Sequence, residues 1–152
     1  MSPYKKYSPA SEEDMEKRMK GDNTLCNILR EMYRMSSDSE IMLKLRIAFS
    51  MGKAMCGRLT FYKEKYGFQQ SEVQDGVWRE FRKRDPIDVS EMDKKRWEGH
   101  RSICQTIRDI YHLSNNEELR LKCRVALSMT KAMHERLKEY KAMEVQNVSN
   151  SG

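Results

Sequence analysis

Proline and glycine are scarce in this sequence, with three prolines and seven glycines among 152 residues. Their scarcity argues against a collagen-like repeat or a flexible low-complexity chain. Long apolar runs are absent too, and none approaches the roughly 20 residues that a membrane helix needs. The first residues lack the apolar core of a secretion signal. We therefore expect a cytoplasmic protein that makes no contact with a membrane.

Cysteine and histidine are also few, and their spacing matches no metal or catalytic motif. The four cysteines include no CxxC pair, and no two of the three histidines have the spacing of metal ligands. No Ser/His/Asp or Cys/His cluster and no glycine-rich phosphate loop is present. The sequence therefore predicts core thiols in a reducing compartment, no metal site, no cofactor and no enzymatic activity.

Charge is abundant, because charged residues make up 34% of the chain. Such a composition with few helix breakers is typical of long, solvent-exposed helices. The 29 basic residues exceed the 23 acidic ones, which gives a net charge of +6. A basic excess of this size favours partners such as nucleic acid or an acidic protein surface, without deciding between them.

One stretch of the chain occurs twice. It reads KLRIAFSMGKAMCGRLTFYK from Lys44 to Lys63 and returns as KCRVALSMTKAMHERLKEYK from Lys122 to Lys141. At this offset of 78, residues 17–63 match residues 95–141 at 21 of 47 positions without a gap. Two copies are too few for an open solenoid. We expect them to pack face to face about a pseudo-two-fold axis, as in a symmetric dimer.

Helical periodicity divides each copy into three helices. In the first copy we expect a short helix capped by Ser11, a second from about Thr24 to Met35 and a long one from about Glu40 to Lys65. The long helix of the second copy is expected from about Glu118 to Met143. Ser37 with Glu40, and Asn115 with Glu118, have the spacing of a capping box.

One face of each long helix repeats apolar and small residues at alternating spacings of four and three, as a packing seam requires. The seam residues are Ile41, Leu45, Ala48, Gly52, Met55, Leu59 and Tyr62, and then Leu119, Cys123, Ala126, Thr130, Met133, Leu137 and Tyr140. The sequence thus predicts an all-α, internally duplicated bundle with a connecting helix at about Ser71–Arg84. Its expected divisions are an arm (1–10), repeat 1 (11–66), a connecting segment (67–89), repeat 2 (90–143) and a flexible tail (144–152).

A basic stripe is repeated on the long helices. Arg46 and Lys53 recur as Arg124 and Lys131, on the side of each helix opposite the seam. A line of cations can bind phosphates. An ordinary solvated helix face explains the same residues, so both interpretations remain open.

The joint between the copies (residues 71–101) mixes basic and aromatic residues. Interleaved cations and aromatic rings suit a phosphate track with stacked bases. However, this segment has eight acidic residues as well as eight basic ones, and its tryptophans are equally suited to packing in the core. The candidate nucleic-acid contacts here are Arg79, Arg82, Lys83, Arg84, Lys94, Lys95, Arg96 and Trp97.

These features favour a non-enzymatic binding protein that contacts DNA or RNA through its basic faces, as a regulator or accessory factor. The alternative is a protein-binding adaptor, inhibitor or structural assembly component that uses the pseudo-symmetric helical surface. The size, basicity and compact duplication resemble those of small proteins encoded by bacteriophages, a likeness of general character rather than of motif. The oligomeric state is left open.

Overall fold

The computed structural model describes residues 9–16, 24–67, 86–93 and 101–151, and within these ranges every regular element is helical. This confirms the predicted all-α class for the described part of the chain. In chain order the elements are α1 (Glu12–Glu16), α2 (Thr24–Met35), α3 (Ser39–Tyr66), the 3-10 helix η3 (Val89–Asp93), α5 (Arg101–Leu113) and α6 (Glu117–Ser151).

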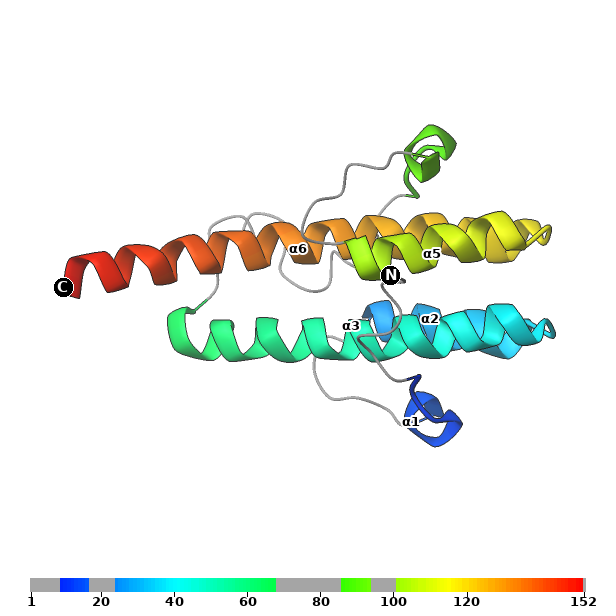
Figure 1. The fold of residues 1–152 in the computed structure, drawn as a ribbon, viewed down its shortest axis with the longest axis horizontal. Coiled ribbons are helices and arrows are strands. Elements are labelled where there is room, and N and C mark those ends of the chain that lie inside the picture. The colour runs from blue at the N-terminus through cyan, green and yellow to red at the C-terminus, as the bar shows by residue number, and fades with distance from the viewer. Residues whose placement is uncertain (1–8, 17–23, 68–85, 94–100, 152) are drawn as a thin grey trace.

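Among the described helices, α2, α3, α5 and α6 form the bundle (Figure 1). Hairpin 1 consists of α2 and α3, hairpin 2 consists of α5 and α6, and the helices within each hairpin pack on one another. Between the hairpins, α3 packs on α5 and on α6, and α2 packs on α6. Both hairpin turns lie at the same end of the bundle, and α6 reaches beyond α3 at the other end (Figure 1). The short helices lie outside this bundle, α1 against hairpin 1 and η3 against α5.

The predicted seam is the centre of the core. Its six residues from Ile41 to Leu59 on α3 and its seven from Leu119 to Tyr140 on α6 are all buried, whereas Tyr62 is half-buried. Gly52 lies where α2 approaches α3 closely, because a Cβ atom at this position would be 3.3 Å from Cδ2 of Leu25. A larger side chain would require Leu25 to shift by a few tenths of an ångström, so the position favours a small residue, as its place in the seam suggested.

The helix caps differ from prediction by one residue. Asp38, not Ser37, caps α3, and its Oδ1 accepts from the backbone N–H groups of Glu40 at 2.9 Å and Ile41 at 3.0 Å. In hairpin 2 it is Asn116, not Asn115, whose Oδ1 accepts from the N–H of Leu119 at 3.0 Å. Since α3 begins at Ser39 and α6 at Glu117, Asp38 and Asn116 are the residues directly before the helices, and a side-chain oxygen there can accept from the free N–H groups of the first turn.

The ends of the long helices follow the breakers in the sequence. Gly67 ends α3 with a φ of 80°, and its N–H donates to the carbonyl of Lys63 at 2.8 Å, as predicted for a glycine stop. The boundary predicted at Met143 was too early, because α6 continues to Ser151. No glycine or proline interrupts residues 144–151. The predicted connecting helix at 71–84 lies outside the described residues. Among the described helices, none is both long and apolar enough to cross a membrane.

Candidate functional site

The two stripe arginines hold backbone segments. The Nε–H of Arg46 donates to the carbonyl of Ala10 at 2.6 Å, and the N–H of Ala10 donates back to the carbonyl of Arg46 at 3.0 Å. The Nε–H of Arg124 donates to the carbonyl of Ile87 at 2.6 Å, and the N–H of Ile87 returns a bond of 3.4 Å. Each arginine therefore makes the same reciprocal clamp on a segment that precedes its hairpin.

The clamped segments, which we call strap 1 (residues 9–16) and strap 2 (residues 86–93), share a sequence pattern. They read PASEEDME and PIDVSEMD. Each begins with proline and an apolar residue and ends with methionine between two acidic residues. Met15 and Met92 occupy the same position in the pattern, and both are completely buried. Each strap is thus fixed at one end by the arginine and at the other by a methionine.

Sequence reasoning missed this pattern because the straps align at an offset of 77, whereas the copies align at 78 from Lys17 onward. One additional residue between η3 and α5 shifts the register and hides the likeness. The signal that would have revealed it is the pair of triplets Asp14-Met15-Glu16 and Glu91-Met92-Asp93. A search that allows a one-residue gap finds them.

Strap 1 also makes polar contacts through its acidic residues. The hydroxyl of Tyr33 on α2 donates to Oε1 of Glu12 at 2.8 Å. Lys53 of the predicted stripe lies 3.9 Å from the Asp14 carboxylate. Ser11 caps α1 as expected, because its Oγ accepts from the N–H of Asp14 at 3.1 Å. The structure therefore brings Arg46 and Lys53 together beneath strap 1.

The remaining predicted contacts are placed as follows. Lys131 is exposed on α6, and Arg124 lies against strap 2. The predicted contacts of the joint, Arg79, Arg82, Lys83, Arg84, Lys94, Lys95, Arg96 and Trp97, lie outside the described residues.

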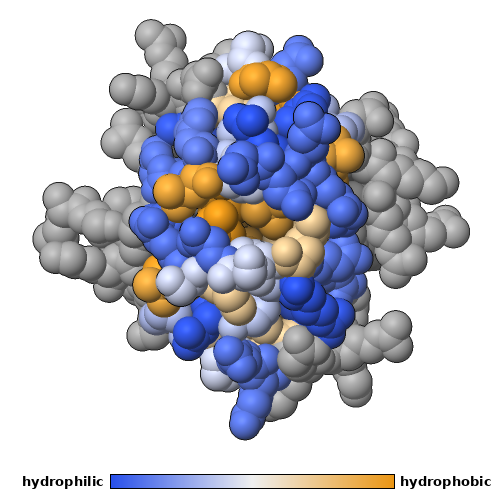
Figure 2. Space-filling view, turned by 90° about the vertical axis from the view of Figure 1, so that its right-hand side faces the viewer, coloured by the Kyte–Doolittle hydropathy of each residue, from blue (hydrophilic) through white to orange (hydrophobic). Residues whose placement is uncertain are grey.

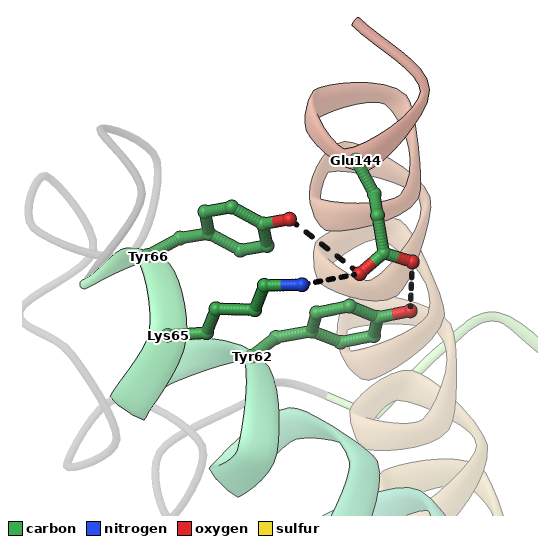
Figure 3. Close-up of polar contacts among 4 residues, drawn as sticks. All are labelled: Tyr62, Lys65, Tyr66 and Glu144. Atoms are coloured by element: carbon green, nitrogen blue, oxygen red, sulfur yellow. Dashed lines mark hydrogen bonds and ion pairs between the residues drawn. The ribbon is translucent and has the colours of Figure 1, made fainter. Parts of the chain in front are cut away.

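A tyrosine cluster joins the C-terminal end of α3 to α6 around the carboxylate of Glu144 (Figure 3). The hydroxyls of Tyr62 and Tyr66 donate to it at 3.4 and 3.5 Å, and the Lys65 ammonium donates at 3.2 Å. Burial and the Glu144 carboxylate raise the pKa of Tyr62. Hydrogen bonds with Tyr66 and Glu144 raise the pKa of Lys65, so its cationic form is favoured.

Ring stacking extends the cluster to the centre of α6. The rings of Tyr62 and Tyr140 stack with their centroids 5.4 Å apart and their planes at 7°. The hydroxyl of Tyr140 donates to the carbonyl of Gly67 at 2.8 Å. These contacts fasten the last turn of α3 to α6, which is a structural role.

Besides Lys65–Glu144, two further ion pairs among the described residues cross between the hairpins. Lys44 on α3 lies 3.9 Å from Asp109 on α5, and Lys122 on α6 lies 3.3 Å from Glu31 on α2. At the offset of 78, Lys44 corresponds to Lys122 and Glu31 corresponds to Asp109. In each of these two pairs, therefore, a lysine on the longer helix of one hairpin contacts an acidic residue on the shorter helix of the other hairpin.

The cysteines are free thiols, of which Cys26, Cys104 and Cys123 are buried and Cys56 is half-buried. Burial raises the pKa of both Cys104 and Cys123 to about 12, so these two thiols are uncharged and poor nucleophiles at neutral pH. Within the described ranges, no group of three His, Cys, Asp or Glu residues is arranged to hold a metal ion.

Comparison with protein-family models, with curated proteins and with solved structures finds no match to this chain. Its function is therefore inferred from the clamps, the straps and the helical surface.

Proposed function

We propose that this chain is a non-enzymatic binding protein whose partner is another protein. The observation that carries the proposal is the repeated clamp, in which Arg46 and Arg124 each donate Nε–H to a backbone carbonyl. Every polypeptide has backbone carbonyl groups, and the backbone N–H that completes each clamp is present in every residue except proline. The face that was predicted to bind phosphate thus already holds peptide at two equivalent places.

Duplication about a pseudo-two-fold axis is part of this proposal, and two kinds of contact support it. In a two-fold interface, residue i of one unit meets residue j of the other, and j meets i in return. The ion pairs Lys44–Asp109 and Lys122–Glu31 follow this exchange. Residues on such an axis meet their own equivalents, as Tyr62 and Tyr140 do in their stack.

Exposed leucines at repeated positions supply apolar area for a protein partner. Leu43 on α3 and Leu121 on α6 correspond at the offset of 78, and each is 45% exposed. Figure 2 shows hydrophobic residues among hydrophilic ones at the end of the bundle that carries both hairpin turns. Phosphate recognition makes no use of exposed leucines, whereas protein interfaces combine apolar contacts with a polar rim.

Nucleic-acid binding is the second candidate function, and the net charge of +6 favours it. Lys53 and Lys131 recur at exposed positions of the two long helices, so they remain candidate phosphate contacts. Binding of this kind weakens steeply with salt, because each phosphate contact adds about 0.7–0.9 to the slope of log affinity against log salt.

Purification of the tagged full chain from its native cells distinguishes the two functions. The proposal predicts a protein partner in fixed ratio that is retained after nuclease treatment and in high salt, because apolar contacts are weakly screened. The matched test replaces Leu43 and Leu121 by Ser, which leaves every charge in place and should weaken recovery of that partner. Recovery of nucleic acid alone, released by nuclease or salt, would instead support the second candidate.

A further inference from the structure

We propose that the surface beneath each strap is a binding site for a partner peptide with the strap's own chemistry, an inference that rests on the proposed protein-binding function. The ligand is a peptide that begins with proline followed by an apolar residue. Five residues after the apolar residue it has a methionine, with an acidic residue on each side of that methionine. In the isolated chain, strap 1 and strap 2 occupy the two sites in place of this partner.

The two straps together define what the sites recognise. Between their shared ends, strap 1 reads SEE where strap 2 reads DVS. Despite this difference, the carbonyls of Ala10 and Ile87 accept from their arginines at the same distance of 2.6 Å. Met15 and Met92 are buried equally. The sites therefore select the apolar residue and the methionine and tolerate change between them.

Charge complementarity adds to this selection at the first site. Strap 1 has four acidic residues within residues 12–16, in a chain whose net charge is +6. Asp14 lies against Lys53, and Glu12 accepts a hydrogen bond from Tyr33. An acidic peptide thus finds a cation in Lys53 and a hydrogen-bond donor in Tyr33 on this surface.

The way strap 1 is held makes exchange with a partner feasible. Its helix α1 spans only five residues, far below the roughly 12–15 at which an isolated helix becomes marginally stable. Its order therefore depends on its contacts with hairpin 1, and such segments open locally without global unfolding. A partner binds only when the strap is open, so its apparent affinity is reduced by the fraction of open sites.

The test measures binding of a fluorescent eight-residue peptide with the sequence of residues 86–93 to the full chain by anisotropy. Met15→Asp places a charge at the buried end of strap 1 and should open the first site. We expect weak binding to the parent chain and binding at least about tenfold tighter to the Met15→Asp chain, because the competing strap is removed. A peptide with aspartate in place of its methionine is the ligand control, and it should not bind.

Arginine variants in the Met15→Asp chain identify the site. Arg46→Gln should weaken peptide binding by about tenfold, since one hydrogen bond to a charged group is lost. Arg124 lies at the other site, so Arg124→Gln should leave peptide binding at the first site unchanged. Equal loss from both variants, or no binding to a Met15→Asp chain that circular dichroism shows to be folded, would overturn the inference.

If the Met15→Asp chain does not fold, displacement of strap 1 in the parent chain tests the same inference. Excess peptide should then displace strap 1, and the backbone amide resonances of Ala10 and Asp14 should move to the positions of an unstructured segment. Unchanged resonances at saturating peptide would contradict the inference. They would leave the protein-binding function itself intact, because that function is tested separately by recovery of the native partner.

Discussion

At the residue scale, the two stripe arginines show what a helical pattern can and cannot reveal. Their spacing predicts that Arg46 and Arg124 lie on the side of each helix opposite the seam, and in the structure both are half-buried against a strap. The residues that they contact are 36 and 37 positions away along the chain. Periodicity identifies the face of a helix but not the distant segment that covers it, so a clamp and a solvated stripe are indistinguishable in the sequence.

Loss of either clamp should destabilise the fold. Arg46→Gln and Arg124→Gln each remove a hydrogen bond from a charged donor, and we expect a loss of about 1–3 kcal/mol in the free energy of unfolding. Lys138→Gln removes a charge from an exposed position on α6 and should change stability by less than about 0.5 kcal/mol. Urea unfolding measures all three. Equal effects from the three variants would show that the clamps contribute nothing beyond charge.

The buried thiols should make stability fall in alkaline solution. The pKa of Cys104 is raised by burial from 9.0 to about 12. Since the folded pKa is the higher one, the thiol contributes stability that is fully present below pH 9 and is lost as the pH rises toward 12. Urea unfolding of the parent across this range should show a steeper decline than that of Cys104→Ala. Parallel curves would contradict burial of an uncharged thiol.

At the element scale, long helices were easier to predict than their ends. The bounds of α2 match the prediction, because its apolar face and flanking polar residues mark both ends. The seam was also correct, since burial follows directly from the spacing of apolar residues. The end of α6 was missed because the last residues are polar, and only the structure shows that Glu144 is held there by Tyr62, Lys65 and Tyr66.

Truncation of the seam should be costly in both long helices. Leu59 and Leu137 are almost completely buried, so Leu59→Ala and Leu137→Ala should each lower the free energy of unfolding by about 2–5 kcal/mol. Leu43 is 45% exposed, and Leu43→Ala is the matched control, with an expected change below about 1 kcal/mol. Thermal or urea unfolding tests the set. A control as destabilising as the two seam variants would mean that the seam is misassigned.

Removal of the Glu144 carboxylate should lower the pKa of Tyr62. Burial and the Glu144 carboxylate both raise the pKa of Tyr62 above 10.0. Glu144→Gln removes the carboxylate but not the burial, so the pKa of Tyr62 should fall and yet stay above its ordinary value. Phenolate absorbance during a pH titration follows this change. Glu135→Gln, an exposed position on the same helix, should have no effect on the pKa of Tyr62.

At the scale of the whole molecule, we propose that one unit is used twice, consisting of a strap, an arginine that clamps it, and a helical hairpin. The sequence repeat from which we infer duplicated hairpins was visible without the structure. The straps were not, because a single additional residue changes their offset from 78 to 77. Which surface a partner uses also lay beyond sequence reasoning, since Arg46 and Arg124 are as well suited to phosphate as to a carbonyl.

The most direct test of this account is nuclear magnetic resonance of the arginine Nε–H groups in the isotopically labelled full chain. We predict that the Nε–H resonances of Arg46 and Arg124 are protected from exchange with water; Arg46→Gln and Arg124→Gln identify them, because each variant removes one of the two. Both should keep their positions when duplex DNA or RNA is added at low salt, because their acceptors are the carbonyls of Ala10 and Ile87. Protected resonances that move or lose protection when nucleic acid is added would show that these arginines bind phosphate, and would contradict the account.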